Sequence, residues 1–109
     1  MKKDPKVFIG HIFDCINEIE KNTNGLNYKD FFKSTLVQDA VIRRLEIIGE
    51  ASKNIPESFK KEHNNIPWDK MSAMRNILIH EYFGVDLGLV WQVVQKDLPP
   101  IKDLIEKLL

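Results

Sequence analysis

The chain has 109 residues, of which 43% are apolar and ten are aromatic (six Phe, two Trp and two Tyr). This length and composition are typical of one folded domain over residues 1–109, and they exclude a disordered chain. The 16 basic residues are balanced by 16 acidic ones. That balance argues against general nucleic-acid binding, which needs a basic excess, but it leaves room for a local basic pocket.

The chain is expected to be cytoplasmic. Its one cysteine, Cys15, excludes an intrachain disulfide and fits a reducing compartment. The N-terminal Met-Lys-Lys-Asp-Pro-Lys looks like the charged start of a signal peptide, but His11 and Asp14 interrupt the apolar stretch that follows. No run approaches the roughly 18 to 20 apolar residues that a membrane span needs.

The first helix is predicted over about residues 5–22. Asp4 suits its N-cap, and Pro5 suits the first helical position. The Asn-Thr-Asn-Gly turn over 22–25 ends it. Its apolar residues recur at the helical period, which predicts an inward stripe. That stripe comprises Val7, Phe8, Ile12, Cys15, Ile16 and Ile19.

A short helical piece is predicted over 28–32, followed by a long second helix that ends near residue 54. Ser34 or Thr35 is expected to cap this long helix. The residues predicted to point inward are Leu36, Val37, Ala40, Val41, Leu45, Ile48 and Ala51. Cys15 on the first helix is expected to act as a small buried hydrophobic residue facing this core.

The second half of the chain continues the helical period. A short amphipathic helix is predicted over 56–63, and Pro67 opens the next helix. Asp86 is expected to cap a last helix, which Pro99 and Pro100 should kink or split. The predicted inward residues are Trp68, Met71, Met74 and Leu78, then Leu87, Val90, Trp91, Val94 and Leu98. No segment alternates as a strand does. The fold class predicted is therefore all-α, with four or five helices packed as a bundle.

Residues 74–82 read Met-Arg-Asn-Ile-Leu-Ile-His-Glu-Tyr and place four hydrogen-bonding side chains within an apolar helical segment. Arg75 and His80 are notable because the chain has three arginines and three histidines against thirteen lysines. A charge beside core residues needs a partner or a role. Arg binds phosphate through a bidentate fork, and His titrates near neutral pH. The segment therefore indicates phosphate chemistry.

Helical geometry separates these polar side chains. At about 100° per residue, Asn76 and His80 share a face and Arg75 lies within about 20° of Tyr82. Arg75 and His80 are about 140° apart. For both to contact one phosphate, the Arg side chain must wrap round, the helix must loosen before Gly84, or two subunits must contribute. A symmetric dimer would bring two copies of the segment to one cleft.

A structural interpretation stands beside the functional one. Arg75 would pair with an acid such as Glu46 or Glu50, and His80 would be a helix-end histidine stabilised by the C-terminal dipole. The spacing of Arg75 and His80 alone favours this interpretation, because perturbed charged sites are often structural.

The longer pattern Arg75-Asn76-x-x-x-His80-x-Tyr82 resembles the R-N-x-x-x-H-x-Y signature of HepT-like toxins, in the HEPN superfamily of small helical ribonucleases. The flanking sequence agrees, with Trp68 before the motif, Met74 ahead of the arginine, Tyr-Phe-Gly-Val-Asp after it and a similar helix over 39–51. The resemblance covers nearly the whole chain in helix order and length. No motif position departs from the family pattern.

This resemblance implies a HEPN-like, homodimeric, up-and-down bundle with its active cleft at the dimer interface. It implies that Arg75 and His80 are the catalytic pair of a metal-independent RNA endonuclease, with Asn76 as their polar neighbour. Tyr82 would be the tyrosine that a nucleotidyltransferase antitoxin of the MNT type modifies with AMP to silence the toxin. No metal or cofactor is expected.

The chemistry of RNA cleavage fits these roles. The 2′-hydroxyl of RNA is an internal nucleophile, so cleavage needs a base, a proton donor and a clamp for the developing charge. His80 would transfer protons, and Arg75 would stabilise the charge on the phosphate oxygens. AMP on Tyr82 would add bulk and negative charge where RNA phosphate binds. The alternatives are a non-catalytic helical subunit that binds nucleotide or tethers the nucleotidyltransferase, and a purely structural oligomer subunit.

Other residues allow two interpretations. Arg43 and Arg44 are candidates for RNA binding, but ion pairing with Glu46 or Glu50 explains them equally well. These two acids stand at i and i+4, yet without a matching histidine they are expected to form a solvated face and not a metal site. Trp68 and Trp91 are expected in the core and not as base-stacking platforms. His11 is expected at the boundary of the first apolar stripe and His63 at an exposed helix end, so neither is given a role.

Overall fold

The computed structural model describes residues 4–80 and 86–109, and within these ranges every regular element is a helix. The elements in chain order are α1 (Pro5–Thr23), α2 (Tyr28–Lys33), α3 (Thr35–Lys53), α4 (Glu57–Glu62), α5 (Trp68–His80), α6 (Leu87–Gln92), a π-helical turn (Val93–Asp97) and α7 (Leu98–Glu106). The all-α prediction is confirmed.

Helix α1 begins where the sequence predicts. The Asp4 carboxylate accepts a hydrogen bond from the backbone N–H of Lys6 at 2.9 Å, which satisfies one of the unpaired donors at the helix start. Ile9, Ile12, Cys15, Ile16 and Ile19 are buried. The prediction for Val7 is wrong, because its side chain is 45% exposed. Val7 lies five positions before Ile12, about 140° round the helix, and so faces away from the core.

Helices α2 and α3 are capped in succession. Asn27 and Asp30 form a reciprocal capping box at the start of α2. Ser34 caps α3, with its hydroxyl accepting from the backbone N–H of Val37 at 3.2 Å. Leu36 was predicted to point inward, but it is 81% exposed. It stands five positions before the fully buried Val41, so the same rotation of about 140° turns it to solvent.

The last helical run contains the predicted break. Asp86 caps α6 by accepting from the backbone N–H of Leu89 at 3.1 Å. The run then widens into the π-helical turn, in which the N–H of Leu98 bonds the carbonyl of Val93 five residues back. Pro99 and Pro100 have no N–H for the carbonyls four residues before them, and their rings clash with a regular α-turn. The wider turn relieves both problems, and α7 continues from it.

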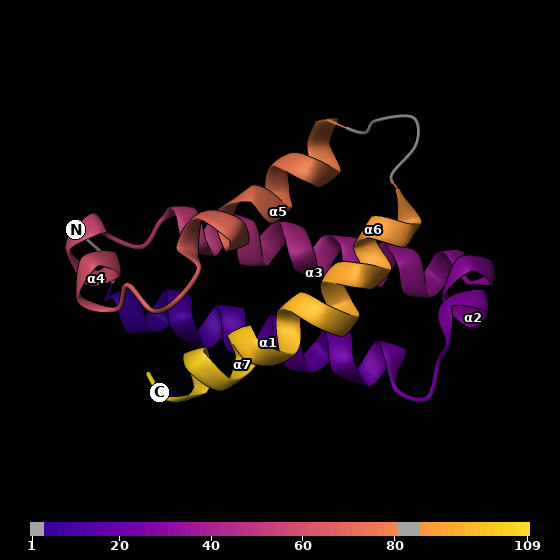
Figure 1. The fold of residues 1–109 in the computed structure, drawn as a ribbon, viewed down its shortest axis with the longest axis horizontal. Helices are drawn as coiled ribbons and strands as arrows, with labels where there is room; N and C mark the ends of the chain where they lie inside the picture. The colour runs from indigo at the N-terminus through magenta and orange to yellow at the C-terminus, as the bar shows by residue number, and fades with distance from the viewer. Residues whose placement is uncertain (1–3, 81–85) are drawn as a thin grey trace.

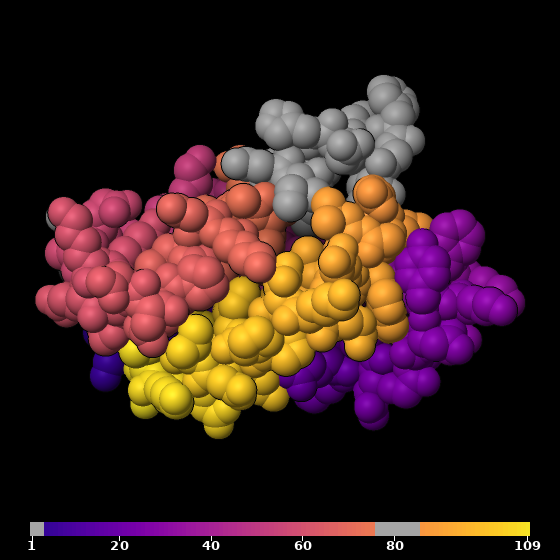
Figure 2. Space-filling view, in the orientation of Figure 1, coloured from indigo at the N-terminus to yellow at the C-terminus, as the bar shows by residue number. Residues whose placement is uncertain are grey.

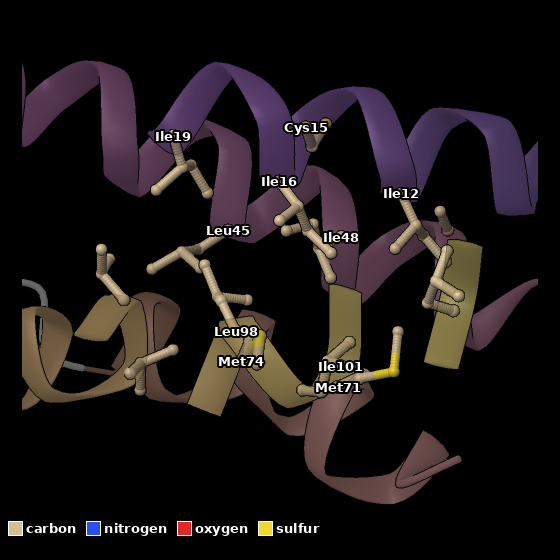
Figure 3. Close-up of a cluster of buried hydrophobic side chains, with 14 of the residues drawn as sticks. Ile12, Cys15, Ile16, Ile19, Leu45, Ile48, Met71, Met74, Leu98 and Ile101 are labelled. Carbon is tan, nitrogen blue, oxygen red and sulfur yellow. The ribbon is translucent and has the colours of Figure 1, made fainter. Parts of the chain in front are cut away.

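The long helices run up and down and enclose one core. Helix α3 packs against both α1 and α5, while α7 packs against α1. Figure 1 shows α5 and the α6–α7 run crossing α1 and α3 obliquely. In the space-filling view these two runs form much of one face, with α4 at one end (Figure 2). Side chains of α1 and α3 point toward those of α5 and α7 in the core (Figure 3).

Both tryptophans belong to this packing. The Trp68 side chain is buried, and its indole N–H donates to the carbonyl of His63 at 3.0 Å. Trp91 is half-buried, with its ring centroid 5.1 Å from that of Phe31. The prediction of a core residue is confirmed for Trp68, while Trp91 packs against the core and stays partly exposed. Within residues 4–80 and 86–109, no helix is both long enough and apolar enough to cross a bilayer.

Candidate functional site

The candidate site is built at a close approach between α3 and α5. A Cβ atom placed on Gly49 would lie 2.7 Å from the Cβ of Arg75 and 2.8 Å from its backbone nitrogen. These distances are shorter than van der Waals contact, so any side chain at position 49 would push the helices apart. The absence of a side chain on Gly49 therefore sets how deeply Arg75 sits against α3.

The next residue of α3 meets the arginine side chain. The Nε of Arg75 lies 2.8 Å from Oε2 of Glu50, in an ion pair between two partly exposed groups. The Arg75 side chain is 34% exposed and that of Glu50 is 53% exposed. Pairing with Glu50 is what the structural interpretation of Arg75 predicted. It does not enclose the guanidinium, because the contact is made at Nε and a third of the side chain still meets solvent.

Arg75 lines a groove with a volume of about 520 Å³ between α1, α3 and α5. The groove is lined by Phe8, His11, Arg43, Glu46, Ile47, Glu50, Ala51, Asn54 and Arg75. Two arginines, one histidine and two carboxylates thus share one open surface with a few apolar side chains. Such a surface provides phosphate-binding groups beside groups that orient them.

The two remaining arginines diverge. Arg43 lines the groove and forms an ion pair with Glu46, with Nη1 3.7 Å from Oε2. Arg44 is not among the lining residues. Burial raises the pKa of the Cys15 thiol, and a hydrogen bond to Arg44 partly offsets this by lowering it. Only Arg43 of this pair therefore shares a surface with Arg75.

The other motif residues are covered only in part. His80 ends α5, so its backbone continues the helix that carries Arg75. The side chains of residues 76–80, which include Asn76 and His80, lie outside what the structure describes, as does the whole of Tyr82. The roles predicted for these three residues stay predictions.

Sequence reasoning gave no role to His11, which is exposed on α1 and lines the groove together with Phe8. The two residues stand three positions apart, so they share a helix face. That spacing was readable from the sequence. What it faces depends on how α1 packs against α3, and no local pattern encodes that packing.

The acids of the groove are engaged with cations. Glu46 pairs with Arg43, and Glu50 pairs with Arg75. Among the described residues, no group of three or more His, Cys, Asp or Glu side chains is arranged to hold a metal ion.

The family model described as ribonuclease HepT-like matches residues 12–108. The chain belongs to the HepT-like ribonuclease family. This match includes the groove residues of α3 and α5, Arg75 and the motif that follows it, while Phe8 and His11 of α1 precede it. It confirms the resemblance drawn from the sequence.

Relatives of this HepT-like chain cover its full length. A Thermococcus cleftensis protein named "Probable ribonuclease HepT" is 48% identical over 108 residues, which are 99% of this chain and 98% of the relative. A Methanocaldococcus jannaschii protein, named for gamma-glutamylcyclotransferase and a proposed RNase, is 52% identical over all 109 residues. The chain spans 49% of that longer relative. No solved structure matches the chain.

Proposed function

We propose that this HepT-like chain is a metal-independent RNA endonuclease, with Arg75 and His80 as its catalytic residues. The observation that carries the proposal is the position of Arg75, which is anchored against Gly49, oriented by Glu50 and open to a groove. Family membership and relatives named as ribonucleases support the same activity.

The proposed reaction uses the nucleophile of the RNA itself. A His80 imidazole removes the proton of the 2′-hydroxyl, and the 2′-oxygen attacks the adjacent phosphorus. The bond to the 5′-oxygen breaks, and that oxygen leaves with a proton from a protonated imidazole. Arg75 stabilises the negative charge that develops on the phosphate oxygens. The products are a 2′,3′-cyclic phosphate and a 5′-hydroxyl, and no step needs a metal ion.

We place the active cleft between two copies of the chain. On a straight helix Arg75 and His80 point about 140° apart, so one protomer presents them poorly to one phosphate. A two-fold axis near the end of α5 would bring two arginines and two histidines together. One histidine would then serve as base and the other as acid. Light scattering of the purified protein tests the dimer.

Regulation by a nucleotidyltransferase of the MNT type is part of the proposal. AMP on Tyr82 would place a negative charge two residues from His80, where substrate phosphate is expected. Intact-mass spectrometry after co-expression with the transferase would show mass increments of AMP. Tyr82→Phe should abolish them.

Arg43 is proposed to bind RNA phosphate outside the catalytic centre. Residues 1–109 are proposed to act as one domain in the cytoplasm.

The second candidate function is a non-catalytic subunit that binds nucleotide and partners the transferase. The composition of the groove favours it, because two arginines beside apolar side chains suit the phosphate and the base of a nucleotide. Incubation of purified protein with RNA in EDTA separates the two functions. Cleavage that falls about 100- to 10,000-fold in His80→Ala, with the fold retained, supports the nuclease. RNA or nucleotide binding without cleavage by the wild type supports the binding subunit.

A further inference from the structure

Helix α3 places one carboxylate directly against the guanidinium of Arg75. Glu50 follows Gly49, whose missing side chain brings the α5 backbone close to α3. From there Glu50 Oε2 reaches Nε of Arg75 at 2.8 Å. Two consecutive residues of α3 thus contact the arginine: Gly49 meets its backbone and Cβ, and Glu50 meets its guanidinium.

We propose that Glu50 is a positioning residue that aims the guanidinium of Arg75 into the groove to receive an RNA phosphate. The contact is made at Nε, the guanidinium nitrogen nearest the backbone. The outer edge, with its two Nη groups, is then directed at the substrate. A guanidinium is planar, so fixing one nitrogen restricts the orientation of the whole fork. This inference rests on the proposed nuclease function.

The alternative role for Glu50 is to compete with RNA for Arg75. Competition predicts that removing Glu50 strengthens RNA binding and does not slow the chemical step. Positioning predicts the opposite, because a misdirected clamp loses its contact with the transition state. The atom that makes the contact favours positioning, since an acid that competes with phosphate is expected at the two Nη groups, and the ion pair is made at Nε.

The chain provides a matched control in Glu46, one helical turn before Glu50. Glu46 lines the same groove and carries the same charge. Its ion-pair partner, however, is Arg43, at the longer distance of 3.7 Å. Replacing Glu46 changes the charge of the groove by the same amount as replacing Glu50 but leaves the Arg75 contact in place.

The experiment measures kcat and KM for RNA cleavage by Glu50→Ala, Glu50→Gln and Glu46→Gln, together with thermal unfolding of each. Glu50→Ala should lower kcat about 10- to 100-fold with a smaller change in KM. Glu50→Gln keeps an oxygen that accepts from Nε, so it should recover most of the lost rate. Glu46→Gln should stay within about 3-fold of the wild type.

A double-variant comparison separates positioning from a general structural role. In an Arg75→Ala background, Glu50→Ala should have no further effect on kcat, because its action passes through the arginine. A second loss of equal size would overturn the proposal. So would a wild-type kcat in Glu50→Ala, or a Glu46→Gln loss as large as the Glu50→Ala loss.

Failure of the nuclease function itself is detected separately. Binding of an uncleavable all-2′-deoxy oligonucleotide is measured by fluorescence anisotropy on the same variants. If the wild type cleaves no RNA, the nuclease proposal fails. Weaker binding in Glu50→Ala than in Glu46→Gln then still supports positioning of Arg75 for phosphate. Equal or tighter binding in Glu50→Ala contradicts it.

Discussion

Gly49 and Arg75 touch across the α3–α5 interface with no room for another carbon, since a Cβ on Gly49 would lie 2.7 Å from the Cβ of Arg75. The atoms in the way are the arginine's own backbone nitrogen and Cβ, which cannot swing aside as the tip of a flexible side chain can. The depth of the proposed catalytic arginine is therefore set by a residue on a different helix.

Gly49→Ala should destabilise the fold by about 1–3 kcal/mol, because overpacking forces the helices to separate. It should also lower RNA cleavage by moving Arg75 away from its place beside Glu50. Denaturant unfolding and cleavage rates measure the two effects. Gly10→Ala on α1 is the control, since a Cβ there meets nothing within 4 Å. That change should instead stabilise the helix by up to about 1 kcal/mol. Equal changes in unfolding free energy and cleavage rate for Gly49→Ala and Gly10→Ala would contradict the close approach of Gly49 to Arg75.

The two neighbouring arginines of α3 should behave differently in RNA binding. Arg43→Ala removes a charge from the groove. It should reduce the salt dependence of single-stranded RNA binding by about 0.7 in the slope of log K against log salt. Arg44→Ala should leave that slope unchanged, because Arg44 does not line the groove. Anisotropy titrations at several salt concentrations measure both slopes. A larger slope change in Arg44→Ala would show that the wrong arginine has been assigned to RNA.

Cys15 should make the protein less stable at alkaline pH. Burial raises the pKa of its thiol above the ordinary value of 9.0. The unfolded chain therefore loses this proton at lower pH than the folded chain does. The stabilisation is fully present below about pH 9 and is lost as pH rises toward the folded pKa. Unfolding free energies from pH 8 to 10.5 should fall less steeply for Cys15→Ala than for the wild type. If the unfolding free energies of Cys15→Ala and the wild type fall in parallel with pH, burial does not raise the pKa of Cys15.

Local chemistry made the helix starts predictable. Asp4, Ser34 and Asp86 each accept a backbone N–H in the first turn of the helix that follows, as their side chains and positions indicated. Inward residues were predicted well inside the long helices but not in their first turns. Val7 and Leu36 are apolar and near the apolar stripes, yet each lies too far round its helix to reach the core.

The sequence predicted those residues of the site that lie on one helix, but not those that helix packing brings beside them. The motif around Arg75 is contiguous in sequence, so the resemblance identified it. The groove is not contiguous, because it takes Phe8 and His11 from α1 and Arg43 and Glu50 from α3. Which acid meets Arg75 was left open between Glu46 and Glu50, which share a helix face. The packing of Gly49 against α5 decides for Glu50.

The most direct test uses a DNA oligonucleotide that contains a single ribonucleotide, incubated with the wild type in EDTA. We expect cleavage only on the 3′ side of the ribose, leaving a 2′,3′-cyclic phosphate and a 5′-hydroxyl. Arg75→Ala and His80→Ala should each slow it by about 100-fold or more while remaining folded. Cleavage at deoxyribose positions, a strict requirement for added Mg²⁺, or undiminished cleavage by either variant would contradict the central claim.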